Sequence, residues 1–131
     1  MENPSIMSHI SIGTNNFEKA IAFYDKVLAT IGAKRVHDLS QYGAIAYGKQ
    51  FPEFWVQKPH DEKEARVGNG THFAFFASSK EQVHAFYNAA VEMGATDDGA
   101  PGPRPHYGEQ YYGCFLRDLD GHKIEAMAWL A

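Results

Sequence analysis

An internal repeat restricts the fold of this chain more than any other feature of its sequence. The second half matches the first at an offset of 63 residues, which is the separation of His9 and His72. Amphipathic helices alone can match by chance, but chance would not also align strands, histidines and helix-ending glycines. The repeat nearly fills the 131 residues, so we expect two similar modules. The matching positions are His9 and His72, Glu18 and Glu81, Ala22-Phe23-Tyr24 and Ala85-Phe86-Tyr87, and, after a slip of one residue, Gly32 and Gly94.

Each half opens with a strand and continues with a helix. The alternating runs at 6–13 and 71–77 are too short, and too rich in β-branched or aromatic residues, to be helices. Apolar residues then recur at helical spacing over about 17–31 in the first half and 83–93 in the second. The expected terminal residues are Asn15 and Gly32 for the first helix, and a capping box of Ser78 with Glu81, followed by Gly94, for the second.

Further strands complete a β-α-β-β-β pattern in each half. A hairpin turn is predicted at 118–121, and the proline-rich residues 97–106 are expected to be irregular with at most an edge pairing. We therefore expect one α+β domain over residues 1–131, with βαβββ repeats at about 5–60 and 68–130. The two modules would form a mixed, curved sheet around a cavity, with helices on the outer face. The further strands are expected at 34–39, 42–47, 53–57, 110–117 and 122–129.

Charge and cysteine content exclude several classes of partner and site. The net charge is −4 and there are no runs of Lys or Arg, which argues against nucleic acid and anionic membranes as partners. No apolar segment is long enough to span a bilayer, and no signal-peptide pattern is visible, so we expect a cytoplasmic protein. Cys114 is the only cysteine, so a metal site must use His and carboxylate ligands. We expect Cys114 itself to be a small buried hydrophobic residue.

Strand alternation places four candidate ligands on one face of the predicted sheet. Residues two apart in a strand point the same way, so the apolar sets that pack on the helices leave the alternate residues on the helix-free face. Two imidazoles and a carboxylate on that face suit a divalent transition metal. A histidine on a strand is more often solvated or hydrogen-bonded, but the symmetry of these positions under the repeat favours the metal site. The four residues are His9, Gln57, His72 and Glu125.

Three segments carry a resemblance to a known superfamily: SHISIGTNNFEKAIAFYDKVL, GTHFAFF and RDLDGHKIEAM. With them the chain resembles the vicinal oxygen chelate superfamily, which includes glyoxalase I, fosfomycin-resistance transferases, extradiol dioxygenases and bleomycin-resistance proteins. The resemblance implies that His9, His72 and Glu125 bind a divalent metal ion (Ni, Zn, Mn or Fe), with Gln57 at the fourth-strand position. It also implies a homodimer, since subunits of several members share the metal site.

Gln57 departs from the glyoxalase I pattern, which is acidic at that position. A glutamine cannot take a proton, so Glu125 is the only candidate catalytic base among the four residues. The resemblance favours a metal-dependent enzyme similar to lactoylglutathione lyase, which acts on a small oxygenated or thiol-conjugated metabolite through a metal-stabilised enediolate or alkoxide. The alternatives are a metal-free protein that binds small molecules and confers resistance, and an extradiol-type dioxygenase.

A loop at 104–112, flanked by glycine and proline, carries most of the candidate substrate-binding residues. Its arginine can hold a carboxylate in a bidentate manner, and its His and Tyr side chains can orient an anionic or phenolic substrate. The segment fits equally well a stiff exposed hairpin whose tyrosines cover the core. Trp55 and Trp129 can wall the pocket or fill a dimer interface. The candidates are Arg104, His106, Tyr107, Tyr111, Tyr112 and Trp55.

Overall fold

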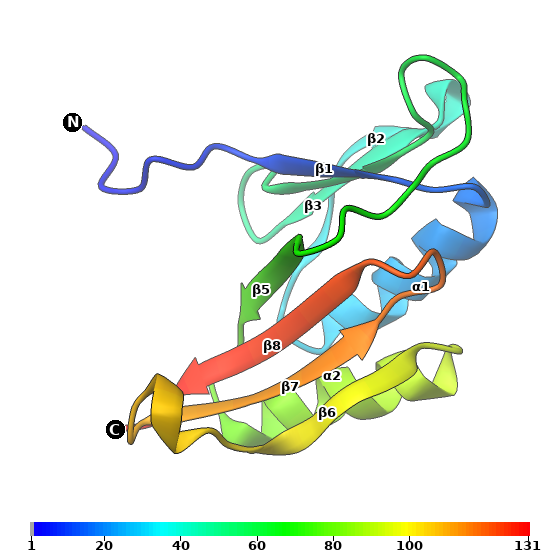
Figure 1. Cartoon of the computed structure of the whole chain (residues 1–131). Helices are drawn as coiled ribbons and strands as arrows, with labels where there is room; N and C mark the ends of the chain where they lie inside the picture. The colour runs from blue at the N-terminus through cyan, green and yellow to red at the C-terminus, as the bar shows by residue number, and fades with distance from the viewer. Residues whose placement is uncertain (1) are drawn as a thin grey trace.

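The computed structural model describes residues 2–131 and contains two βαβββ modules (Figure 1). Each module has one four-stranded sheet and one α-helix of 13 residues. The first module consists of β1 (Ile10–Gly13), α1 (Phe17–Ala29), β2 (Lys34–Leu39), β3 (Ala44–Gly48) and β4 (Phe54–Gln57). The second consists of β5 (His72–Phe76), α2 (Lys80–Glu92), β6 (Thr96–Pro103), β7 (Tyr111–Arg117) and β8 (Lys123–Trp129). Short 3-10 turns lie at Ser40–Tyr42 and Pro105–Tyr107.

The two sheets have the same topology, which confirms the predicted repeat. Their strand orders are β1-β4-β3-β2 and β5-β8-β7-β6. The first and last strands of each module pair in parallel, and the other pairs are antiparallel. The α+β class with two βαβββ modules is therefore confirmed. The strands form two separate sheets that do not close around a cavity, because β1 and β5 are both edge strands that have no strand partner on one side among residues 2–131.

The parallel pairings define which positions of the two modules correspond. Ser11 lies opposite Trp55, and Ala74 lies opposite Glu125. Ser11 and Ala74 correspond to each other, since each follows by two residues a histidine that the repeat aligns. The repeat therefore relates Glu125 to Trp55. Gln57, which the sequence pattern assigns to this position, lies two residues farther along β4.

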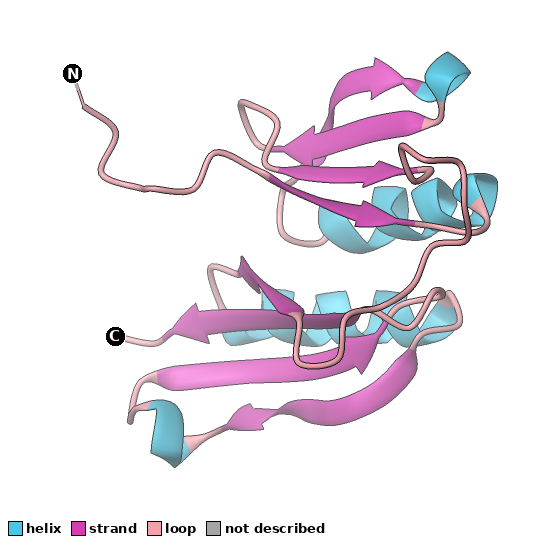
Figure 2. Cartoon of the chain, turned by 45° about the horizontal axis from the view of Figure 1, so that its top comes forward, coloured by secondary structure: helices cyan, strands magenta, loops and turns pink. Residues whose placement is uncertain are grey.

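One apolar core joins the two modules. Each helix packs on its own sheet (Figure 2), and α1 also contacts α2. The ring of Phe54 in β4 meets that of Phe75 in β5 at a centroid distance of 5.1 Å, and Phe75 lies 5.9 Å from Phe86 of α2. The buried residues of both modules form a single cluster, so each module buries part of its apolar surface against the other.

The turn between β7 and β8 connects the second module to the first by hydrogen bonds. The sequence Asp118-Leu119-Asp120-Gly121 predicts this turn, and Gly121 has the expected positive φ of 96°. Its polar side chains reach the β1–α1 connection and α1 itself. The inter-module pairs are the Tyr24 hydroxyl with Asp118 at 2.5 Å, the Asn15 backbone N–H with Asp120 at 2.9 Å, and His122 Nε2 with the Gly13 carbonyl at 2.8 Å.

The first helix begins at Phe17 as predicted, but its capping residue and its last residue differ from the prediction. Asn16 rather than Asn15 is its N-cap and accepts a hydrogen bond from the Lys19 backbone. The side chain of Asn15 instead pairs with the backbone of Ala65 in the loop after β4. The helix ends at Ala29, two residues earlier than predicted, because the chain turns toward Gly32 with its φ of 83°.

The second helix begins one residue later than expected. Ser79 is the N-cap and accepts a hydrogen bond from the backbone of Gln82. The side chain of Gln82 in turn accepts from the backbone of Ser78. The predicted box of Ser78 with Glu81 is therefore wrong by one position. No helix within residues 2–131 has the length and apolar character needed to cross a bilayer.

Two strands differ from the sequence expectation. The first strand begins at Ile10 rather than Ile6, because its partner β4 begins at Phe54 and leaves residues 6–9 without a neighbouring strand. Residues 97–106 are more regular than expected. Most of them belong to the edge strand β6, whose register to β7 shifts twice around Gly99, which agrees with the predicted edge pairing.

Candidate metal centre

The second sheet has one face that no helix covers, and the predicted ligands His72 and Glu125 lie on it. Residues of β7 and β8 that point toward α2, such as Cys114 and Ile124, are buried in the core. Side chains alternate along a strand, so their neighbours point to the opposite side. We call this side the open face. Its residues in β5, β7 and β8 are His72, Ala74, Phe76, Tyr111, Gly113, Phe115, Arg117, Lys123, Glu125, Met127 and Trp129.

Glu125 is a buried carboxylate with two different partners. Its Oε2 accepts a hydrogen bond from the Tyr111 hydroxyl at 2.7 Å. Its Oε1 lies 3.3 Å from Nε2 of His72. The side chain of Glu125 is 9% exposed and that of His72 is 45% exposed. The pair therefore combines an enclosed oxygen atom and a solvent-accessible nitrogen atom, both of which can bind a metal ion.

Aromatic rings enclose Tyr111 next to this carboxylate. The rings of Tyr107 and Trp129 meet it edge-on, at centroid distances of 5.1 and 5.9 Å. Burial, followed by the neighbouring Glu125 carboxylate, raises the pKa of the Tyr111 hydroxyl above its ordinary value. The hydroxyl therefore stays protonated and remains a hydrogen-bond donor at neutral pH.

Two cationic groups flank Phe115, the residue opposite Glu125 in β7. The guanidinium of Arg104 lies 5.6 Å from the centre of the Phe115 ring, and the ammonium of Lys123 lies 5.2 Å from it. Arg104 is fixed in place by hydrogen bonds to the backbone carbonyls of Ala100 at 2.8 Å and Pro103 at 3.2 Å. These contacts use two of its five donors, so the others are available to an anionic group.

The first module does not bring its candidate ligands to this pair. His9 precedes β1 and is exposed, with Nδ1 2.9 Å from the Ser8 hydroxyl. Trp55 is half-buried and its ring lies 6.0 Å from that of His37, while Gln57 is half-buried farther along β4. Within residues 2–131, no three His, Cys, Asp or Glu side chains come together as a metal site.

The loop candidates separate into two groups. Arg104, Tyr107 and Tyr111 gather around Phe115 and Glu125. The ring of the exposed His106 lies 4.2 Å from that of Tyr107 and is tilted by 48° to it. Tyr112 lies on the other face of β7, where its hydroxyl is 2.7 Å from His84 of α2. Tyr112 is therefore not part of the open face.

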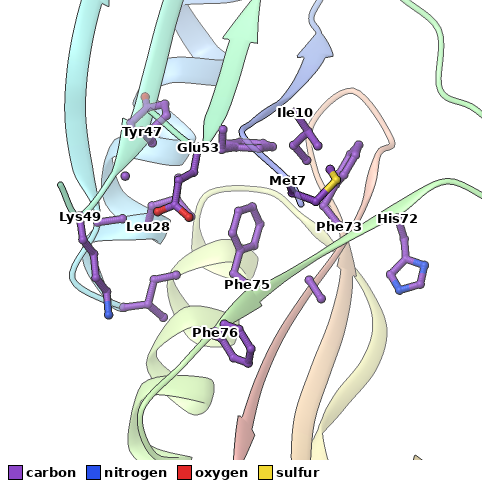
Figure 3. A pocket seen from close by; sticks show the side chains of 15 residues that line it. Met7, Ile10, Leu28, Tyr47, Lys49, Glu53, His72, Phe73, Phe75 and Phe76 are labelled. Atoms are coloured by element: carbon purple, nitrogen blue, oxygen red, sulfur yellow. The ribbon is translucent and has the colours of Figure 1, made fainter. Parts of the chain in front are cut away.

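A cleft of about 470 Å³ opens between the edge strands β1 and β5 (Figure 3). Its walls are mainly apolar and include Ile10, Leu28 and Phe75, with His72 at one border. In Figure 3, His72 lies on the opposite side of β5 from Phe75 and Leu28. Glu125 and Tyr111 do not line this cleft, so the cleft meets the candidate metal centre only at His72.

The donor set fits a divalent transition metal in kind but is incomplete in one chain. Imidazole nitrogen and carboxylate oxygen are ordinary ligands of such ions. His72 and Glu125 are close enough to share one ion after small side-chain rotations. Beside this pair the described residues provide no third His, Cys, Asp or Glu, so a third protein ligand has to come from another place.

Sequence reasoning missed three residues of the open face. Gly113 lies under the Tyr111 ring, Phe115 has both cations over its ring, and Lys123 is next to His72 across the β5–β8 pairing. The alternation of side chains along a strand could have identified them, because Gly113 and Phe115 lie an even number of residues from Tyr111, and Lys123 lies two residues from Glu125.

Known proteins share the sequence pattern and the fold of this chain. The sequence matches the family model of the Glyoxalase/Bleomycin resistance protein/Dioxygenase superfamily over residues 6–126. The chain belongs to this superfamily. The solved structure of a glyoxalase/bleomycin resistance protein from Albidiferax ferrireducens T118 is similar to this chain, with 34% sequence identity and a TM-score of 0.85. That match covers 95% of this chain and 99% of the other.

More distant members of the superfamily have the same fold. A V278E mutant of glyoxalase I from Zea mays is 22% identical, with a TM-score of 0.70 over 95% of this chain and 46% of that chain. A genomically encoded fosfomycin resistance protein from Listeria monocytogenes is 20% identical, with a TM-score of 0.64 over 95% and 93% of the two chains. No curated protein matches the sequence significantly.

Proposed function

We propose that this superfamily member is a metal-dependent enzyme, a lyase or isomerase of the glyoxalase type. The proposal rests mainly on the pair of His72 Nε2 and Glu125 Oε1, 3.3 Å apart on the open face. Its substrate is a small oxygenated or thiol-conjugated metabolite. His9, His72 and Glu125 would hold a divalent ion (Ni, Zn, Mn or Fe). A bound ion of this kind would supply a Lewis acid that polarises a substrate oxygen.

In this proposal the third ligand, His9, comes from a second copy of the chain. His9 is exposed, and β1 and β5 are both free edges that another copy can approach. A two-fold homodimer would place His9 of each chain beside His72 and Glu125 of its partner, which gives two equivalent sites. The same symmetry would cover apolar side chains such as Phe76, which is 71% exposed.

The remaining side chains have roles toward the substrate. Glu125 is the only carboxylate among the predicted ligands and can accept a substrate proton. Arg104 and Lys123 are placed to bind an anionic group above Phe115. Tyr107, with its ring exposed beside them, offers a surface to an apolar or phenolic part of the substrate. Neither Tyr112 nor Gln57 takes part.

Metal content tests this function first. Protein purified without chelator and offered Ni, Zn, Mn and Fe(II) should retain near one ion per chain. Glu125→Gln and His72→Ala should abolish that retention, whereas His84→Ala, a change at an exposed residue of α2 on the other side of the second sheet, should not. The loaded protein should then isomerise a hemithioacetal to a thioester. Wild-type protein that retains none of the four ions contradicts the proposal.

A metal-free binding protein is the second candidate. Trp55 favours it, because a large aromatic ring stands at the position that corresponds to the ligand Glu125. Such a protein would bind a small aromatic compound with the open face and with Trp55 of the first sheet. Its affinity would then be the same in wild type, His72→Ala and Glu125→Gln, whereas Trp55→Ala would weaken it.

A further inference from the structure

The two carboxylate oxygens of Glu125 make contacts that differ in length and in exposure to solvent. The contact of Oε2 with Tyr111 is 2.7 Å long and involves a residue that is only 4% exposed. The contact of Oε1 with His72 is 3.3 Å long, and the side chain of His72 is 45% exposed. Short contacts between enclosed groups exchange less readily than long contacts open to water. The Tyr111 contact is therefore the fixed one.

Gly113 makes the Tyr111 contact possible. Tyr111 and Gly113 lie two residues apart on the same face of β7, and the tyrosine ring folds back over the glycine. A Cβ atom at residue 113 would overlap with the Tyr111 hydroxyl and lie 2.7 Å from its Cζ. The same atom would lie 2.9 Å from the backbone carbonyl of Ala126. Any side chain at residue 113 would therefore displace the hydroxyl from Glu125.

From these contacts we propose that Tyr111 is a positioning residue for the metal centre, and that Gly113 provides the space it needs. Tyr111 holds Oε2, so Glu125 offers Oε1 alone to an ion that His72 Nε2 also binds. Glu125 is then a monodentate ligand whose orientation is set before the ion arrives. This inference rests on the proposed metal-dependent function and assigns to Tyr111 a contact with Glu125 rather than with substrate.

Fixing Glu125 in this way has a direct thermodynamic consequence. Residues that hydrogen-bond to a ligand typically change metal affinity about 10- to 100-fold when they are removed. Without the Tyr111 hydroxyl, the carboxylate of Glu125 would have to be ordered at the moment of binding, and Oε2 would be left buried without its donor. Metal affinity should fall even though every ligand is still present.

The test is a titration of metal-free protein with Ni, Zn or Mn, followed by calorimetry or by competition with a chromogenic chelator. Tyr111→Phe and Gly113→Ala should each weaken binding about 10- to 100-fold. The matched control is Tyr112→Phe, the neighbouring tyrosine on the opposite face of β7, which should bind within about twofold of wild type. The double variant should bind no more weakly than the weaker single variant, because both changes remove the same hydrogen bond.

The outcomes separate the two proposals. If wild type binds ions and Tyr111→Phe binds them equally well, the positioning role is wrong while the metal-dependent function stands. If wild type binds no ion, both fall. If the two single changes add fully in the double variant, Gly113 acts independently of Tyr111, and the inferred mechanism is wrong. Because Tyr111→Phe keeps the ring and its packing, it decides the matter even if Gly113→Ala fails to fold.

Discussion

Trp55 in β4 occupies the position that corresponds to Glu125 in β8. In the parallel strand pairs Trp55 lies opposite Ser11 and Glu125 lies opposite Ala74. Ser11 and Ala74 are equivalent positions of the repeat, so Trp55 and Glu125 are equivalent too. The first module therefore contributes a histidine but no carboxylate to the proposed metal centre. A carboxylate placed at this position would complete a symmetric set of four ligands.

Trp55→Glu should accordingly tighten metal binding. A fourth protein ligand with negative charge is expected to improve affinity by about tenfold, or about 1.4 kcal/mol. The matched control is Gln57→Glu, which adds the same charge two residues farther along β4 and should have a smaller effect. Calorimetric titration of both variants measures the difference. An equal or larger gain from Gln57→Glu would show that Gln57, not Trp55, is the ligand position.

The hydrogen bond from Tyr24 to Asp118 should contribute to the stability of the whole chain. It connects α1 to the β7–β8 turn, and its acceptor is 5% exposed. Tyr24→Phe leaves a buried carboxylate without one of its donors, which costs about 1–3 kcal/mol of unfolding free energy. Urea denaturation measures this loss. Tyr42→Phe, at a tyrosine that is 78% exposed, should change stability by less than about 0.5 kcal/mol, and equal effects of the two changes would contradict the assignment.

Asp118 should also make stability depend on pH. Burial raises the pKa of its carboxyl above the ordinary 3.8, and the hydrogen bond from Tyr24 only partly opposes this shift. The folded state therefore binds the proton more tightly than the unfolded chain does. The stability gained in this way is fully present below pH 3.8 and is lost as pH rises through the native pKa.

The corresponding measurement compares wild type with Asp118→Asn between about pH 3 and pH 7. The asparagine does not titrate, so the difference in unfolding free energy between the two proteins isolates this carboxyl. Wild type should lose stability relative to the variant as pH rises from the ordinary carboxyl range. A difference that is constant, or that grows in favour of wild type with rising pH, would refute the shift.

Cys114 should be unreactive in the folded protein. Its side chain is fully buried, and burial raises the pKa of the thiol to about 12. Thiolate is the reacting form, so a disulfide reagent at about pH 8 should modify the native protein only as fast as it opens. Addition of denaturant should expose one reactive thiol per chain. Rapid stoichiometric modification of the native state would contradict this placement.

Much of the architecture follows from local patterns in the sequence. The offset between His9 and His72 reveals the two modules, because equivalent strands and helices recur at the same spacing. Helix boundaries are less certain, since Asn15 and Asn16 are both good capping residues. The contact of the Asn15 side chain with Ala65, which lies far away in the sequence, decides between them. No local pattern contains that contact.

The candidate site is predictable only in part for the same reason. Strand parity places His72 and Glu125 on one face, and the structure brings them together. Parity cannot distinguish Trp55 from Gln57, since both point the same way and only the register of β1 with β4 separates them. It also cannot show that Tyr111 folds back over Gly113 to reach Glu125, because that contact depends on a side-chain rotamer.

Mixing two defective variants tests the central claim, a metal centre shared between two copies of the chain. His9→Ala and Glu125→Gln should each fail to retain metal alone. In a homodimer with shared sites, about half of all dimers formed from an equal mixture pair the two variants, and each of these has one intact site of two, so about a quarter of the metal binding should return. Metal content measured after the two are unfolded and refolded together gives the answer. Recovery near a quarter is the predicted result, and no recovery above the separate variants would contradict the shared site.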